Sequence, residues 1–170
     1  MSLTHREFWT VFHGMLIGAV YLLAFGGGFA GLWNMTSAAL TPTAMHERVR
    51  RLIVGTWVMA IICWITVISG TYIVYPWYRA ATADSAKSRL LANPAMSEWH
   101  NFGMEWKEHI AWIAPLLATA VAMIVMRYRE ELAVRPEIRR ATMVLFVLAF
   151  FAAAVAGVFG AFINKAAPIL

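Results

Sequence analysis

Four long apolar stretches constrain this chain more than any other feature of its sequence. Each is about as long as the roughly 20 helical residues that cross the hydrocarbon core of a bilayer. They cover residues 8–33, 52–77, 109–126 and 141–163. With 61% hydrophobic and 14% charged residues in a chain of 170, a soluble domain could not bury so much apolar surface. The sequence predicts an all-α, integral membrane antiparallel four-helix bundle, forming one transmembrane domain over residues 1–170.

Basic residues set the expected orientation of this bundle. Two short connections, "HERVRR" (46–51) and "RYREELAVRPEIRR" (127–140), hold eight arginines. The termini and the long connection at 78–108 share the remaining six Lys and Arg. The positive-inside rule then places the arginine-rich connections in the cytoplasm. We expect a multi-pass protein of the inner (cytoplasmic) membrane with both termini outside, in the periplasm.

The connection at 78–108 is the longest and most polar, and we expect it to form an outer loop that binds a partner. Its "LANP" and Gly103 favour turns before the third helix. Further along, Pro115 removes a backbone donor and predicts a bend near the outer end of that helix. Tryptophans and tyrosines gather at the same face, as is usual where helices meet lipid headgroups.

Several classes of function are disfavoured. The single cysteine, Cys63, excludes a disulfide framework and a cysteine metal site. No zinc, phosphate-binding or nucleophilic-triad motif is present. The net charge of +5 is explained by topology and anionic lipid, so we expect no nucleic acid. None of the predicted spans carries a charge near its midpoint, which argues against a transporter.

The histidines are the most informative polar residues. By the expected topology His5, His13, His100 and His109 lie towards the outer face, and only His46 lies towards the cytoplasm. His13 in the first span and His109 at the start of the third should lie at a similar shallow depth. Imidazole inside a span is costly and usually faces the bundle interior. Two such groups on facing helices are what a bis-histidine haem requires.

We therefore expect one haem b near the outer face, with His13 and His109 as ligands of the iron. His100 is the substitute for His109. Gly14, Gly18 and Gly70 would make room for the flat macrocycle, and Arg79 could meet a propionate at the interface. His46 has no histidine companion on its face, so a second haem there is not expected. Glu105 and Glu108 beside His109 are interpreted as the solvated first turn of a helix. Alternatively, His109 with Glu105 on one face could take protons from a quinol.

In its four spans and facing histidines, the chain resembles the small four-helix membrane b-type cytochromes. The resemblance is one of general arrangement, without a diagnostic motif, and it departs from the dihaem pattern with histidines near both faces. It implies a single haem b and a role in electron transfer.

Two functions remain open at this point. The first is a haem-binding electron-transfer subunit of a larger respiratory or photosynthetic complex, with quinone as a possible second cofactor. Its partners would be membrane lipid, other subunits of that complex and a c-type cytochrome on the outer side. The alternative is a cofactor-free structural or accessory subunit. Chlorophyll binding through His13 is less favoured, because Trp9 rather than a small residue lies one turn before it.

Overall fold

The protein is an all-helical bundle in its computed structural model, which describes residues 3–36 and 41–168. Four helical segments are long and apolar enough to cross a membrane. They run over His5–Trp33, Pro42–Tyr78, Trp99–Ala133 and Pro136–Ala166. The predicted fold class, a four-helix bundle of the transmembrane type, is confirmed.

Each of the first three spans is assembled from shorter helical pieces. The first contains α1 (His5–Val11), η1 (Phe12–Leu16) and α2 (Ile17–Trp33). The second contains α3 (Pro42–Ser69), η2 (Gly70–Val74) and α4 (Tyr75–Tyr78). The third contains η3 (Trp99–Met104), α6 (Glu105–His109), α7 (Ile113–Tyr128) and η4 (Arg129–Ala133). The fourth is the single helix α8 (Pro136–Ala166), and the short α5 (Ala86–Ala92) lies in the long connection.

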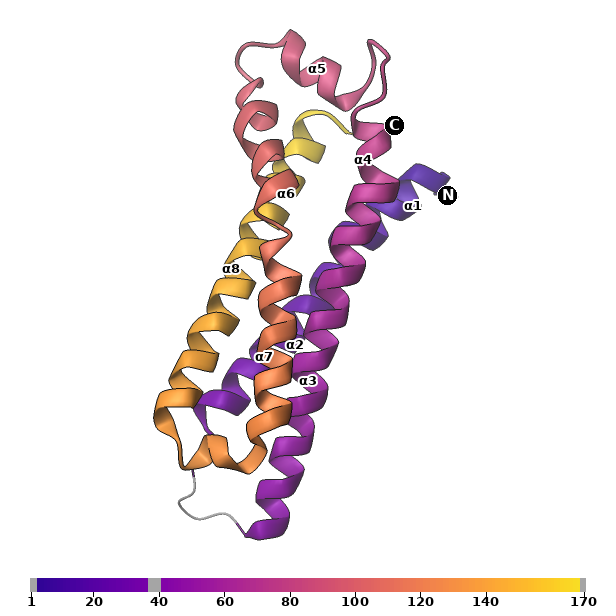
Figure 1. Ribbon diagram of the computed structural model, residues 1–170. Helices are drawn as coiled ribbons and strands as arrows, with labels where there is room; N and C mark the ends of the chain where they lie inside the picture. The colour runs from indigo at the N-terminus through magenta and orange to yellow at the C-terminus, as the bar shows by residue number, and fades with distance from the viewer. Residues whose placement is uncertain (1–2, 37–40, 169–170) are drawn as a thin grey trace.

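The spans run antiparallel and form a ring (Figure 1). Helix α3 packs against α2 and α7, while α8 packs against α7 and α2. The first and third spans therefore lie on a diagonal of the bundle. Both chain ends and α5 lie at one end of the molecule, which we call the terminal end (Figure 1). The opposite end, with the last residue of α2, the first turn of α3 and the connection at 129–135, is called the arginine end.

Local signals explain where the spans begin. Thr4 and Glu7 form a reciprocal capping box at the start of α1, in which each side chain accepts a backbone N–H of the other residue. Thr41 caps α3 and Pro42 occupies its first turn. Pro136 likewise lies in the first turn of α8, which has no side-chain cap.

The structure corrects two predicted boundaries. Residues 46–51 are not a loop but the charged first turns of α3, where Glu47 pairs with Arg50 and Arg51 at 2.8 Å each. The third span begins at Trp99 instead of residue 109, because the polar residues 99–108 are already helical, as η3 and part of α6. Hydropathy detects only the apolar part of a helix, so polar turns at both sites were assigned to loops.

The break expected near Pro115 lies at residues 110–112, between α6 and α7. There the N–H of Ala114 donates to the carbonyl of Ala111 at 3.2 Å, a tighter turn than the α-helix makes. Because the break interrupts the helix, α6 and α7 are two separate helices, and the side chains of α6 need not continue the faces of α7.

The core fills the bundle between the two ends, and the spans present apolar side chains outward. Fully buried side chains come from all four spans, among them Leu32, Met59, Val121 and Phe146. Large hydrophobic side chains that are exposed on the same helices include Leu23, Ile61, Leu116 and Phe151. A surface of this kind suits contact with lipid.

Candidate functional site

Three spans contain a π-helical segment in the half of the bundle nearer the terminal end. η1 includes His13, η2 begins at Gly70, and η3 includes His100. A π-helical turn interrupts the regular ladder of backbone hydrogen bonds and is frequent at functional sites. The three segments mark this half of the bundle as the place to look for chemistry.

His13 reaches across to the second span. Its Nδ1 lies 2.9 Å from the hydroxyl oxygen of Ser69. That hydroxyl donates to the carbonyl of Thr66 at 3.2 Å, so its oxygen is free to accept a hydrogen bond from Nδ1–H of His13. This arrangement leaves Nε2 of the half-buried His13 as a hydrogen-bond acceptor.

Gly70 provides the space that the imidazole occupies. A Cβ added at Gly70 would lie 2.9 Å from Cε1 of His13 and 3.4 Å from its Nε2. Any side chain at position 70 would therefore displace the ring. Gly70 was predicted to make room for a haem macrocycle; in the structure its open side faces the ring of His13.

Lys107 enters the bundle from the third span. A Cβ added at Gly160 of α8 would lie 2.6 Å from the Nζ atom of Lys107, so this glycine makes room for the ammonium group. The ammonium group and the His13 imidazole both lie in the half of the bundle nearer the terminal end. Within residues 3–36 and 41–168, no carboxylate lies within 4 Å of Lys107.

These side chains form one group, which we call the interior polar cluster: His13, Ser69, Gly70, Lys107 and Gly160. Every span contributes at least one member. At a rise of 1.5 Å per residue, His13, Ser69 and Lys107 lie about 12 Å along their spans from the terminal end. The buried hydroxyls of Thr56 and Thr142, by contrast, donate to carbonyls of their own helix.

An ion network covers the same end of the bundle. Nη2 of Arg79 lies 2.9 Å from Glu108 and 3.3 Å from Glu105, and the guanidinium lies 5.1 Å from the ring centroid of Tyr75. Burial lowers the pKa of Arg79, but the hydrogen bond and attraction of Glu108 outweigh this, so the net pKa is raised. Arg79 stays charged and is held by two carboxylates, where the sequence predicted a propionate.

Three further histidines have structural partners. The buried His100 places Nδ1 3.0 Å from the hydroxyl of Tyr78, which ties the start of the third span to the end of the second. His5 accepts a hydrogen bond from the indole of Trp9 at 3.1 Å. At the arginine end, His46 lies 3.4 Å from Glu130 and links two connections.

His109 is placed differently from His13. Its side chain is 70% exposed, and its Nδ1 donates to the carbonyl of Glu105 in the same helix at 2.8 Å. A bis-histidine haem needs its two imidazoles to face one another across the porphyrin. In this structure the exposed His109 does not face His13, so His13 and His109 as haem ligands stay a prediction.

The remaining predicted residues have open surroundings. A Cβ added at Gly14 or Gly18 would meet no atom within 4 Å. These glycines therefore neither pack a neighbouring helix closely nor seat another side chain. In the described part of the chain, no three His, Cys, Asp or Glu residues gather as a metal site.

Sequence reasoning overlooked three members of the cluster. Neither Ser69 nor Lys107 was singled out by the sequence pattern. Gly160 was one of many small residues in an apolar span. Lys107 could have indicated the cluster, because it lies a few residues before an uninterrupted apolar run. Burial of a charged side chain in a membrane span costs free energy, and such residues usually have a function.

Comparison with known proteins adds no assignment. No protein-family model, curated protein or solved structure matches the chain.

Proposed function

We propose that the protein is a membrane electron-transfer subunit of a larger respiratory or photosynthetic complex, and that a quinone reacts at its interior polar cluster. The observation that carries the proposal is that the ammonium group of Lys107 enters the half of the bundle that also holds His13, against Gly160, and that no carboxylate of the described residues 3–36 and 41–168 lies within 4 Å of it. A cation within a membrane span is expensive and usually marks a functional site.

A quinone head group matches the donors and acceptors of this cluster. Its oxygens are strong acceptors, and the ammonium of Lys107 can give one of them a charge-assisted hydrogen bond. In the reduced form the same head group carries hydroxyls, and Nε2 of His13 can accept a hydrogen bond or a proton from one of them. Ser69 holds the imidazole in the tautomer that this requires. The apolar tail of the quinone would lie among the spans or in lipid.

The redox step balances when a partner takes the electrons. Oxidation of a quinol to a quinone breaks two O–H bonds and releases two protons and two electrons. The electrons would pass one at a time to a haem of a partner, such as a c-type cytochrome. The protons would leave through His13 and the carboxylates of Glu105 and Glu108 to water at the terminal end. Reduction of a quinone is the same reaction reversed.

The arginine distribution supports a location for this reaction. With the arginine end in the cytoplasm, the cluster lies on the outer side of an inner membrane. The long connection with α5 would then be available to a periplasmic electron carrier.

A haem b bound by this chain is the second candidate. The observation in its favour is the free Nε2 of His13, since iron binds a neutral imidazole through an unprotonated ring nitrogen. His109 would supply the second ligand only after its side chain turned from the carbonyl of Glu105 towards the interior. A cofactor-free structural subunit is the alternative if neither group binds.

Quinone binding tests the proposal directly. Purified protein in detergent is titrated with short-chain ubiquinone and menaquinone analogues. Binding is followed by quenching of tryptophan fluorescence, because Trp106 and Trp112 lie close to Lys107 in the chain. Wild type should bind saturably, and Lys107→Met should bind about tenfold more weakly, because a hydrogen bond to a charged group is lost.

Lys165→Met is the matched control, since Lys165 is an exposed lysine near the terminal end of α8. Its affinity should equal that of wild type. If both variants bind as wild type does, or if wild type does not bind, the quinone site is not at Lys107.

A further inference from the structure

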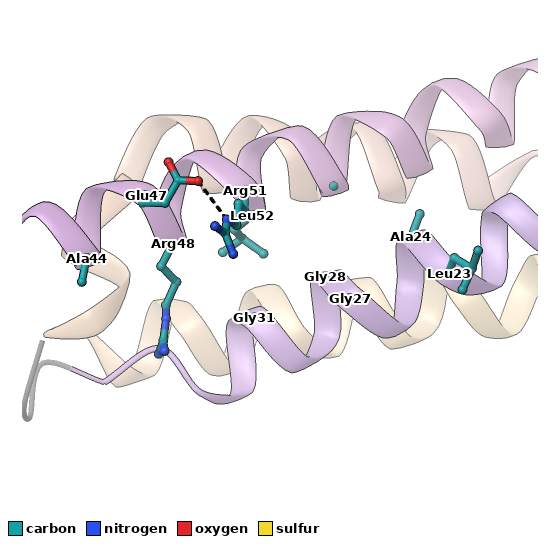
Figure 2. Close-up of a pocket in the computed structure, with 11 residues that line it drawn as sticks. Leu23, Ala24, Gly27, Gly28, Gly31, Ala44, Glu47, Arg48, Arg51 and Leu52 are labelled. Atoms are coloured by element: carbon teal, nitrogen blue, oxygen red, sulfur yellow. Dashed lines mark hydrogen bonds and ion pairs between the residues drawn. The ribbon is translucent and has the colours of Figure 1, made fainter.

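A second site lies at the arginine end, between α2 and α3, far from the interior polar cluster. A groove of about 570 Å³ is lined there by Leu23, Ala24, Gly27, Gly28, Gly31, Ala44, Glu47, Arg48, Arg51, Leu52 and Gly55. Figure 2 shows the glycines along α2 on one side of the groove and the charged side chains of α3 at one end of it. The groove is apolar along its length and charged at that end.

The glycines of the groove have two different roles. Gly28 and Gly31 hold helices together, since a Cβ at Gly28 would lie 2.9 Å from the ring of Phe146 and one at Gly31 would lie 3.2 Å from Leu52. A Cβ at Gly27 or Gly55 would meet no atom of the protein within 4 Å. These two glycines therefore border space that the protein leaves unfilled.

The charged end of the groove is basic. Arg48 and Arg51 enter it from α3, and Glu47 is the one acidic residue of the lining. Glu47 already accepts hydrogen bonds from Arg50 and Arg51. Arg48 donates to the carbonyl of Asn34 at 2.6 Å, which fixes its guanidinium beside the end of α2. Two guanidinium groups at the mouth of an apolar groove complement a phosphate attached to hydrocarbon chains.

We infer that this groove binds one anionic glycerophospholipid, with its phosphate at Arg48 and Arg51 and an acyl chain along Gly27 and Gly55. The chemistry requires both parts, because a free phosphate would leave the apolar length empty and a neutral lipid would not use the arginines. The inference is independent of the proposed redox function and concerns the opposite end of the bundle.

The test measures lipid selectivity in nanodiscs. Full-length protein is placed in phosphatidylcholine discs with or without phosphatidylglycerol, and bound lipid is quantified after extraction into detergent by mass spectrometry of the intact complex. Wild type should retain phosphatidylglycerol preferentially. Arg51→Gln should lower that preference about fivefold, since a basic side chain near a lipid headgroup contributes on that scale. Gly27→Leu should lower retention by filling the groove.

Arg140→Gln is the matched control, because Arg140 is exposed at the same end and lies outside the groove. It should leave retention unchanged. Thermal unfolding of each variant in detergent shows that the bundle is intact, so loss of lipid cannot be ascribed to misfolding. Equal retention of both lipids by wild type, an equal loss in Arg51→Gln and Arg140→Gln, or displacement of the lipid by inorganic phosphate alone would overturn the inference.

Discussion

At the scale of single residues, two glycines determine where the titratable groups of the bundle lie. Gly70 makes room for the ring of His13, and Gly160 makes room for the ammonium of Lys107. The side chains that face these glycines differ in stiffness, since the imidazole of His13 is rigid and the end of the Lys107 side chain is flexible. Substitution at the two glycines should therefore affect the protein in different ways.

Replacement of Gly160 by alanine should move Lys107 without unfolding the bundle. The added Cβ would lie 2.6 Å from Nζ, which is the far end of a flexible side chain and can shift at small cost. We expect the free energy of unfolding in detergent to change by less than about 1 kcal/mol, while quinone binding weakens several-fold. Thermal unfolding and fluorescence titration of one preparation measure both quantities.

Gly157→Ala is the control on the same helix, since a Cβ there meets nothing within 4 Å. Its quinone affinity should match that of wild type. Equal weakening by both alanines would mean that the effect comes from α8 as a whole and not from Lys107.

The interior polar cluster could be predicted from the sequence only in part. A histidine within the first span was visible, but Gly70 was predicted to make room for a haem macrocycle and not for the ring of His13. The partnership of His13 with Ser69 depends on the rotation of two helices about their axes, which apolar spans do not encode in any periodic pattern. Lys107 and His109 are two residues apart and so point to different sides of one helix, and sequence alone did not reveal which of them faces inward.

At the scale of elements, the four spans were predicted, and so was the end of the first at Trp33, but the starts of the second and third spans were placed about ten residues late. Glu47 with its two arginines continues α3 into the polar region, and the π-helical and α-helical turns at 99–109 extend the third span. Both extensions consist of polar helix stabilised by side-chain pairs and contacts. The π-helical segments also escaped prediction, because a one-residue change in helix winding leaves no clear signature in an apolar stretch.

Packing between α2 and α8 can be tested by comparing substitutions at Gly28 and Gly26 of α2. Gly28 is buried, and a Cβ there would lie 2.9 Å from the ring of Phe146 in α8. A buried aromatic ring cannot move aside easily, so Gly28→Ala should destabilise the bundle by about 1–3 kcal/mol. Thermal unfolding in detergent measures the difference.

Gly26→Ala should be neutral or slightly stabilising, since Gly26 is exposed with nothing within 4 Å of a Cβ and alanine is the better helix former. A loss of stability at Gly26 as large as that at Gly28 would show that α2 does not pack against α8 through this face.

At the scale of the whole molecule, the ring order of the spans decides which residues can meet. The first span and the third lie on a diagonal and face one another across the interior, which Lys107 enters from the third span while the exposed side chain of His109 does not. The same ring order places His13 against α3 and Lys107 against α8, and it brings all four spans to the interior polar cluster. The terminal end therefore holds titratable side chains inside the bundle, and the arginine end holds a basic groove.

The measurement that tests the account most directly is a visible spectrum of the protein purified with its native partners, before and after addition of a quinol. We expect quinol to produce the reduced bands of a haem in the complex, and Lys107→Met to slow their appearance about tenfold or more, while Lys165→Met leaves the rate unchanged. A haem on this chain would in addition be lost in His13→Ala and kept in His109→Ala; loss in both would restore the predicted pair. A complex without redox-active bands would contradict electron transfer and favour a structural subunit.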